Sequence, residues 1–199
     1  MKVGGIILCG GQSTRMGRAK AWLPFRGETM LARVVRLLGE AVRPLVVVAA
    51  PDQEVPVLAP EVKIVRDEAQ GRGPLQGLAA GLSALKTDVE AAYLSSCDVP
   101  FLQPAFVRRL IDLLGDNAIC VPRVGEHYHP LAAVYRLEVA EVVSRFLRED
   151  QLRLSLLLKA VPTRVVTPAE LADVDPDGWS LRNLNSPEEY AAALRESTG

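Results

Sequence analysis

Two patterns in the sequence predict an α/β fold with a mostly parallel central sheet. Short apolar runs of strand length, such as residues 3–9 and 45–50, are bounded by glycine or proline. Stretches with apolar residues at helical spacing, such as residues 28–38 and 75–85, lie between these runs. Runs that are apolar throughout are typical of strands buried on both faces, and strands that alternate with helices indicate βαβ units.

The expected strands end at turn signals. The first runs directly into a glycine-rich loop, the second ends at Pro51, and Ala91–Ser96 stops before Asp98-Val99-Pro100. Strands are expected at residues 3–9, 45–50, 62–65, 91–96, 118–121, 130–136 and 163–166.

The expected helices are identified by apolar spacing or by signals at their first turn. Pro104 suits a first helical position, where its missing N–H costs nothing. The segments that begin at Thr167 and Ser186 each combine a hydroxyl cap, a proline and a glutamate three residues after the cap, which is a capping box. Helices are expected at residues 28–38, 75–85, 104–114, 137–148 and 152–159, and from the two caps, the last ending near Arg195.

Composition and charge exclude several classes of protein. The 199 residues are 49% hydrophobic, and without a linker or repeat they predict one domain over residues 1–199. Lys plus Arg number 23 and Asp plus Glu 24, so no positive field favours nucleic acid. No apolar stretch reaches the ~20 residues of a membrane span, so no membrane partner is expected. The three distant cysteines indicate a reducing cytoplasm.

A glycine-rich loop with several cations follows the first expected strand. It begins Leu8-Cys9-Gly10-Gly11 and carries Arg15, Arg18 and Lys20. Ligands bind beyond the carboxyl ends of strands in open α/β sheets, where glycine N–H groups suit phosphate oxygens and cations neutralise them. The loop fits neither the P-loop pattern nor G-x-G-x-x-G, which disfavours a P-loop ATPase and a dinucleotide oxidoreductase. An ordinary basic strand–helix turn is the alternative.

Four further segments contain short motifs that are interpreted together with this loop. The chain contains, in order, L-C-G-G-x-x-x-R-M-G-x-x-K from Leu8 to Lys20, Asp67 followed by Gly73-Pro74-Leu75-Gln76-Gly77, Cys97-Asp98-Val99-Pro100-Phe101, His129-Pro130-Leu131, and Asn183-Leu184-Asn185-Ser186-Pro187-Glu188. Together they resemble the signature of the nucleotidyltransferase superfamily branch formed by molybdenum cofactor guanylyltransferases. The resemblance extends from Ile6 to about Glu189. It implies a three-layer, Rossmann-like α/β nucleotidyltransferase domain with a nucleotide-binding amino-terminal half and an acceptor-binding carboxyl-terminal half.

The resemblance also implies a reaction and a set of functional residues. The reaction is Mg²⁺-dependent transfer of GMP from GTP to a molybdopterin-type cofactor, with release of pyrophosphate and transient contact with cofactor-delivering proteins or molybdoenzymes. The implied catalytic residues are Arg15, Lys20 and Asp98, with Asp98 as the metal ligand. The implied nucleotide-binding residues are Leu8, Cys9, Gly10, Gly11, Lys20, Asp67, Gly73, Pro74, Leu75 and Asp98, and the implied acceptor-binding residues are His129, Asn183 and Asn185.

The residues themselves leave simpler roles open. One carboxylate at a strand end, such as Asp98, is enough for Mg²⁺ when water and phosphate oxygens complete the octahedron, but a turn aspartate is the alternative. Asp67 could be a solvated loop acid, Gly73-Pro74-Leu75 a helix entry, and Asn183 and Asn185 turn residues before the Ser186 cap. Cys9 and Cys97 are interpreted as small buried thiols, not nucleophiles.

Two departures from the family pattern bear on specificity. Ala19 stands where an aspartate usually precedes the loop lysine, and Ala49-Ala50 stands where guanylyltransferases tend to have asparagine. The second departure weakens the prediction of guanine specificity more than that of nucleotidyl transfer. The alternatives are an enzyme of the same fold that uses CTP or another phosphorylated acceptor, and a catalytically silent domain that binds nucleotide or molybdopterin.

Overall fold

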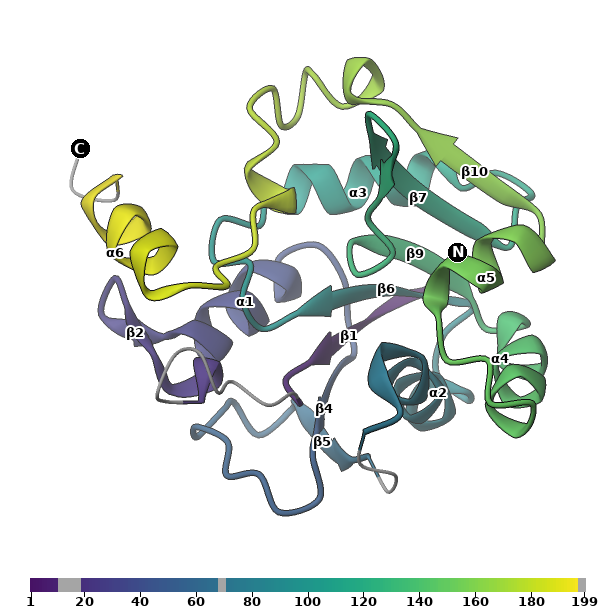
Figure 1. The fold of residues 1–199 in the computed structure, drawn as a ribbon, viewed down its shortest axis with the longest axis horizontal. Helices are drawn as coiled ribbons and strands as arrows, with labels where there is room; N and C mark the ends of the chain where they lie inside the picture. The colour runs from purple at the N-terminus through teal and green to yellow at the C-terminus, as the bar shows by residue number, and fades with distance from the viewer. Residues whose placement is uncertain (11–18, 68–70, 197–199) are drawn as a thin grey trace.

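One mixed sheet forms the centre of the molecule (Figure 1). A computed structural model of the chain describes residues 1–10, 19–67 and 71–196. The sheet order is β10-β7-β9-β6-β1-β4-β5, with β8 paired to β7, and β2 and β3 form a separate hairpin. The strands are β1 (Val3–Leu8), β2 (Pro24–Phe25), β3 (Glu28–Thr29), β4 (Leu45–Ala49), β5 (Lys63–Arg66), β6 (Ala91–Ser96), β7 (Ile119–Val124), β8 (His127–Tyr128), β9 (Ala133–Arg136) and β10 (Thr163–Val166).

The sheet is mostly parallel, as the sequence predicts. β1 pairs in parallel with β4 and β6, β4 with β5, and β7 with β10. β9 alone among the long strands runs antiparallel, between β6 and β7. The carboxyl ends of β1, β4 and β6 therefore meet at one edge of the sheet, where ligands bind in folds of this kind.

Helices cover both faces of the sheet and make three layers. The helices are α1 (Met30–Gly39), α2 (Gly73–Leu85), α3 (Pro104–Leu113), α4 (Val139–Arg148), α5 (Leu154–Ala160) and α6 (Pro187–Glu196), with single 3-10 turns η2 (Lys20–Trp22), η3 (Pro168–Glu170) and η4 (Trp179–Leu181). Apolar residues of α1 and α3 share one core with one face of the sheet, and those of α2, α4 and α5 share a second core with the other face. This arrangement confirms the predicted fold class.

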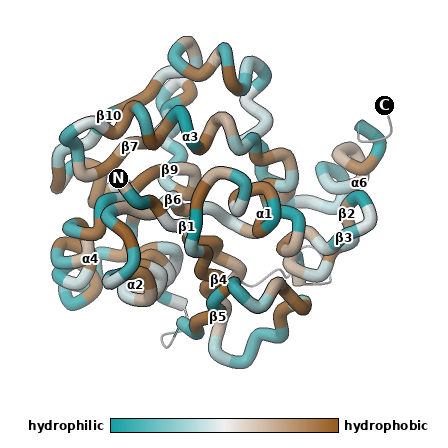
Figure 2. Tube along the Cα trace, turned by 180° about the vertical axis from the view of Figure 1, so that it is seen from behind, coloured by the Kyte–Doolittle hydropathy of each residue, from teal (hydrophilic) through white to brown (hydrophobic). Residues whose placement is uncertain are grey.

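Successive residues of the central strands enter opposite cores. Ile6 packs with α2 and Ile7 with α1, and both side chains are fully buried. The hydropathy trace in Figure 2 accordingly shows hydrophobic colour along the central strands. A smaller third cluster joins Phe25, Phe101 and Leu184 and lies between the β2–β3 hairpin and α6. It anchors the carboxyl-terminal segment against the amino-terminal half of the chain.

Two glycines bring α2 unusually close to β1. A Cβ atom at Gly77 would lie 2.8 Å from Leu8 Cδ2, and one at Gly81 would lie 2.5 Å from Ile6 Cγ2. Gly77 is the last residue of the G-P-L-x-G segment. Its requirement for glycine is therefore explained by helix–strand packing, without a contact to nucleotide.

The expected elements differ from the structure at a few ends. The predicted helix at 28–38 begins at Met30, because Glu28–Thr29 pairs with β2 and the Thr29 hydroxyl accepts a hydrogen bond from Ala32 N at 3.3 Å. The capping box at Thr167 is present, but it opens only the single turn η3 and not a longer helix. β9 begins at Ala133, since residues 130–132 form a turn. The two-residue strands β2, β3 and β8 are too short to produce a periodic pattern.

Candidate active site

Asp98 lies just beyond the carboxyl end of β6, and its carboxylate is held by three side chains. Its Oδ2 is 2.7 Å from Lys20 Nζ, while Oδ1 accepts a hydrogen bond from Ser96 Oγ at 2.6 Å. Asn183 Nδ2 also donates to Oδ1, at 3.4 Å. Only 10% of the Asp98 side chain is exposed. Asp98 lies in the turn that follows β6, but its carboxylate is buried and hydrogen-bonded, unlike that of a turn aspartate that faces solvent.

Lys20 connects the amino-terminal loop to the carboxyl-terminal segment. It begins the 3-10 turn η2 immediately after the glycine-rich loop, and its side chain is 16% exposed. Besides Asp98, its Nζ donates to Asn185 Oδ1 at 2.8 Å. The Lys20 ammonium thus contacts a residue that lies 165 positions away in the sequence. The sequence-predicted residues Lys20, Asp98, Asn183 and Asn185 form one polar cluster, here called the Lys20–Asp98 cluster.

The backbone fixes the two asparagines beside Asp98. Leu184, which lies between them, is 1% exposed, and its N–H donates to the Asp98 carbonyl at 2.9 Å. The capping box at Ser186 follows: Glu189 N donates to Ser186 Oγ at 3.2 Å, and Glu189 Oε2 accepts from Ser186 N at 3.1 Å. These bonds hold residues 183–186 in one conformation between the third core cluster and α6. Both asparagine side chains can therefore lie toward the same carboxylate.

Two thiols lie beside the cluster at the ends of β1 and β6. Both Cys9 and Cys97 are buried, and Cys97 N donates to the Leu8 carbonyl at 3.0 Å. The hydrogen bond from Cys97 lowers the pKa of the Cys9 thiol, and the same bond together with burial raises the pKa of Cys97. Gln53 Nε2 donates to the Cys9 carbonyl at 2.9 Å and so anchors the start of the glycine-rich loop.

The predicted nucleotide-binding residues lie around the same edge of the sheet. Arg15 and Gly11 fall outside the described residues. Leu8 ends β1 and Gly10 is exposed just beyond it. Asp67 follows β5, and its N–H donates to the Ala49 carbonyl at 2.8 Å. The ends of β1, β4 and β5 therefore bring these positions to one side of the molecule.

The predicted nucleotide-binding residues Gly73, Pro74 and Leu75 form the first turn of α2. Gly73 and Pro74 are exposed, whereas Leu75 is fully buried in the core between α2 and the sheet. Gly73 has a φ of 70°, which glycine adopts without strain. The Leu75 side chain is therefore not open to a nucleotide, and a nucleotide-binding role of this segment stays a prediction.

His129 lies apart from the Lys20–Asp98 cluster in its described contacts. It follows the β7–β8 hairpin, its N–H donates to the Pro122 carbonyl at 2.9 Å, and its own carbonyl accepts from Ala132 N at 2.9 Å. Burial lowers the pKa of the half-buried imidazole, and the neighbouring His127 lowers it further. No described contact joins His129 to Asp98, Asn183 or Asn185.

Sequence reasoning missed two residues that shape the site. Ser96 ends β6, two positions before Asp98 in the following turn, and this closeness in the sequence is the signal that it offered. Gln53 carries no such signal, because its contact with Cys9 spans 44 residues and depends on the loop after β4. It lies directly beyond Ala49-Ala50, where the family pattern tends to have an asparagine.

A cavity also lies at the other end of the sheet. It has a volume of about 610 Å³ and is lined by α1, the start of β4 and the loop 57–62. In sheets of this kind ligands bind at the carboxyl ends of strands, and this cavity faces an amino-terminal end. Within the described ranges, no group of three or more His, Cys, Asp or Glu side chains is placed to hold a metal ion.

Fold and site together define a class of protein. In a three-layer, Rossmann-like α/β fold, the sequence has a glycine-rich loop after β1, and Lys20 at the start of η2 pairs with Asp98 beyond the carboxyl end of β6. The family model for the MobA-like NTP transferase domain matches residues 5–163. The chain belongs to this family of enzymes.

Individual relatives agree with the family assignment. The chain is 34% identical over 196 residues to a probable molybdenum cofactor guanylyltransferase of Mycobacterium avium, covering 96% of this chain and 95% of the relative. Its fold is similar to that of molybdopterin-guanine dinucleotide biosynthesis protein A from Archaeoglobus fulgidus, with a TM-score of 0.80, 20% identity and coverage of 100% and 99%. It is also similar to the manganese complex of Rv0371c from Mycobacterium tuberculosis, with a TM-score of 0.65, 17% identity and coverage of 98% and 99%. Every helix in the described part of the chain is too short or too polar to cross a membrane.

Proposed function

We propose that the chain transfers GMP from GTP to a molybdopterin cofactor, with release of pyrophosphate and formation of the guanine dinucleotide cofactor. The observation that carries the proposal is the Lys20–Asp98 cluster, in which Lys20 Nζ lies 2.7 Å from Asp98 and 2.8 Å from Asn185. In this cluster Lys20, which follows residues 11–18 in the sequence, contacts Asp98 beyond β6 and Asn185 of the carboxyl-terminal N-x-N segment. Relatives named as guanylyltransferases over nearly the whole chain support the acceptor and the nucleotide.

The reaction requires positioning more than covalent chemistry by the protein. An oxygen of the acceptor's terminal phosphate attacks the α-phosphorus of GTP, the new P–O bond forms, and the bond to the leaving pyrophosphate breaks. Lys20 and Arg15 neutralise the triphosphate, and the N–H groups at Gly10 and Gly11 bind its oxygens. Asn183 and Asn185 orient the acceptor phosphate by amide hydrogen bonds, while His129 contributes to the acceptor side from the β8–β9 segment.

The chemistry of Asp98 fits a magnesium ion. The single buried carboxylate of Asp98 offers the hard oxygen ligands that Mg²⁺ prefers, and phosphate oxygens and water would supply its other ligands. When bound, Mg²⁺ would supply neutralisation of the negative charge on the phosphates. Ser96 and Asn183 hold Asp98 Oδ1, so Oδ2 is the oxygen that Lys20 would release to the ion.

We also propose how the chain is organised and in which compartment it acts. The 199 residues act as one domain, because a single sheet takes strands from Val3 to Val166 and the Lys20–Asp98 cluster joins the two halves. The three cysteines are free and buried, which supports a place of action in the reducing cytoplasm. Contact with the proteins that deliver or receive the cofactor would be transient.

A nucleotide panel tests the proposed function. Pyrophosphate release is measured from each of the four NTPs with Mg²⁺ and molybdopterin, with the acceptor omitted as the control. Release with GTP and acceptor, and with no other nucleotide, is expected. Preference for CTP would overturn the guanine assignment while keeping the transfer chemistry. Release from no nucleotide, by protein with an intact circular dichroism spectrum, would contradict the enzyme and favour a silent binding domain.

A further inference from the structure

A second cavity, of about 310 Å³, lies beside the segment that follows Asp98. Three parts of the chain form its wall: the β2–β3 turn with α1, the segment after Asp98, and η4 with the end of α6. Its lining residues are Arg26, Arg33, Leu37, Pro100, Phe101, Leu102, Gln103, Trp179 and Glu196. It is called the Arg26 cavity here. None of the residues assigned above to catalysis, nucleotide binding or acceptor binding lines it.

Aromatic rings form part of the wall of the Arg26 cavity. The ring centroids of Phe101 and Trp179 are 4.9 Å apart with an angle of 59° between their planes. Arg182 also lies over both rings, with its Cζ 5.4 Å from the Phe101 centroid and 5.2 Å from that of Trp179, and it is paired with Glu196. The Glu196 carboxylate that lines the cavity is therefore already neutralised. Ring faces of this kind suit a planar heteroaromatic group.

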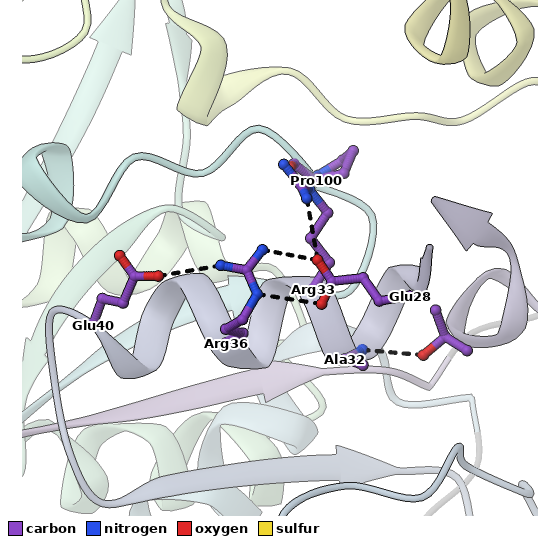
Figure 3. Close-up of polar contacts among 7 residues, drawn as sticks. Glu28, Ala32, Arg33, Arg36, Glu40 and Pro100 are labelled. Atoms are coloured by element: carbon purple, nitrogen blue, oxygen red, sulfur yellow. Dashed lines mark hydrogen bonds and ion pairs between the residues drawn. The ribbon is translucent and has the colours of Figure 1, made fainter. Parts of the chain in front are cut away.

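Two guanidinium groups give the Arg26 cavity positive charge. Arg33 extends from α1, where its Nε donates to the Pro100 carbonyl at 2.7 Å and its Nη1 lies 3.1 Å from Glu28 Oε1 (Figure 3). Arg26 makes no ion pair with any described residue, and its Cζ lies 6.0 Å from the Phe101 centroid. Burial lowers the pKa of Arg33, the hydrogen bond to Glu28 opposes this effect, and the charge of Arg26 lowers the pKa further. An anion between them would relieve this repulsion.

Arg26 keeps a backbone conformation that its residue type disfavours. It has a φ of 51° and Gly27 a φ of 81°, so the hairpin turn requires positive φ at both central residues. Asparagine, aspartate or glycine normally occupies the first of these positions, because a larger side chain costs about 1 kcal/mol there. A long cation at a position that favours asparagine points to a role for the side chain itself.

The Arg26 cavity and the Lys20–Asp98 cluster are built from the same two segments. Phe101 follows Asp98 by three positions, and Trp179 precedes Asn183 by four. The Leu184 N–H holds these segments together at the Asp98 carbonyl, with a distance of 2.9 Å. Residues of the Arg26 cavity thus lie three or four positions along the chain from residues of the Lys20–Asp98 cluster, in both segments.

We propose that the Arg26 cavity is the subsite for the ring end of the acceptor, a planar heteroaromatic group that carries negative charge. This inference rests on the proposed function, because it takes the acceptor phosphate to lie at the Lys20–Asp98 cluster. The ring packs on Phe101 and Trp179, and Arg26 with Arg33 binds the adjacent anionic group. Arg26 is thus a specificity-determining residue for the acceptor and not for the nucleotide.

The test uses tryptophan fluorescence with pterin-6-carboxylate as the probe. The chain has two tryptophans, so W22F leaves Trp179 as the only reporter. Saturable quenching of this variant by the probe is expected, with weaker quenching by neutral pterin. The variant R26N creates an Asn-Gly turn, which is favoured at positive φ, so thermal stability should not fall while affinity for the probe falls about tenfold. The exposed arginine Arg148 on α4 provides the matched control R148N, whose affinity should be unchanged.

Several results would overturn the subsite. They are absence of saturable quenching, equal affinity of R26N and the W22F parent, and equal loss in R26N and R148N, which would indicate non-specific attraction of charge. Failure of the proposed function looks different. If the probe binds at Trp179 and R26N weakens it, but no NTP releases pyrophosphate, the transfer reaction fails and the ring site stands. If GTP is turned over and R26N keeps the wild-type KM for the acceptor, the ring site fails and the transfer reaction stands.

Discussion

Two ion pairs that join distant parts of the chain differ in almost every physical respect. Lys20–Asp98 lies at the carboxyl end of β6 with side chains 16% and 10% exposed. Arg109–Asp173 ties α3 to the segment after η3, with side chains 31% and 60% exposed. The surface pair has the better geometry, because two guanidinium nitrogens meet two carboxylate oxygens. In the buried pair the Lys20 ammonium contacts only Oδ2 of Asp98, and Ser96 and Asn183 donate hydrogen bonds to Oδ1.

The difference indicates what each pair is for. Burying two charges costs several kcal/mol of desolvation, which a single contact between a lysine and one carboxylate oxygen does not reliably offset. An exposed pair costs little and contributes little. Lys20 and Asp98 are therefore poor choices for stability alone. Lys20 and Asp98 are also hydrogen-bonded by other side chains, namely Asn185, Ser96 and Asn183. A bound phosphate or metal ion could replace such contacts, and a pair that served stability alone would gain nothing from that replacement.

Apart from loss of the Asp98 carboxylate itself, removal of the lysine charge should produce the largest effect on the rate. In K20Q, pyrophosphate release should fall about 100-fold and KM for GTP should rise, because a charge that stabilises the triphosphate in the transition state is lost. Steady-state kinetics with GTP as the varied substrate measures both. The exposed lysine Lys159 on α5 supplies the control K159Q, which should match the wild type. A K20Q rate within threefold of the wild type would break the contrast between the two pairs.

Truncation of Asn185 should have the next largest effect. In N185A the Lys20 ammonium loses its 2.8 Å hydrogen bond to Asn185 Oδ1. The phosphate of the molybdopterin substrate loses the hydrogen bond donated by the Asn185 amide. The transfer rate at low acceptor concentration should fall roughly 30-fold, the equivalent of one hydrogen bond to a charged group. KM for GTP should change much less. An increase confined to KM for GTP would assign Asn185 to the nucleotide and contradict its acceptor role.

Loss of the Ser96 hydroxyl should affect the metal more than the substrates. Its 2.6 Å hydrogen bond to Asp98 Oδ1 orients the carboxylate, so in S96A the half-saturating Mg²⁺ concentration should rise about tenfold. Ser95 is the matched control, because it is also buried but its hydroxyl donates to the Ser96 carbonyl, at 3.3 Å, and not to Asp98. Equal Mg²⁺ dependence of S96A and S95A would show that Ser96 acts only in packing.

The surface pair should produce the smallest effect, visible only in acid. The hydrogen bond from Arg109 lowers the pKa of Asp173 below its ordinary value. A lowered pKa in the folded state means that the pair stabilises the protein above the ordinary aspartate pKa of about 4, and that this contribution disappears as pH falls through the folded value. Thermal midpoints of D173N and wild type should therefore differ slightly at pH 6 and converge near pH 3. A difference that grows toward pH 3 would contradict this sign.

Much of the fold was predictable from local pattern. Buried parallel strands such as β1, β4 and β6 are continuous apolar runs, and helices such as α3 and α6 begin at a proline within a recognisable signal. Antiparallel insertion of β9 between β6 and β7 was not predictable, because strand direction depends on tertiary pairing. The capping box at Thr167 shows the limit of a local signal: it specifies a first turn, and nothing downstream of Glu170 continues the helix.

The candidate site was likewise predictable only in part from the sequence. Motif residues Lys20, Asp98, Asn183 and Asn185 were predicted individually, and the structure brings them together, although their catalytic and binding roles stay predictions. Gln53 and the Arg26 cavity had no sequence signal. Each depends on contacts between segments tens of residues apart, such as Gln53 with Cys9 or Arg33 with Pro100. Such contacts exist only once the sheet has formed.

The most direct test exchanges one carboxylate for an amide in each ion pair. Pyrophosphate release from GTP, with Mg²⁺ and molybdopterin, is measured for wild type, D98N and D173N in parallel, with folding checked by circular dichroism. If the Lys20–Asp98 cluster is the transfer site, D98N should lose about 1,000-fold in rate, since a metal ligand is removed, and D173N should stay within twofold of the wild type. A D98N enzyme that retains a tenth of the wild-type rate, or a D173N enzyme that loses as much as D98N, would contradict this assignment.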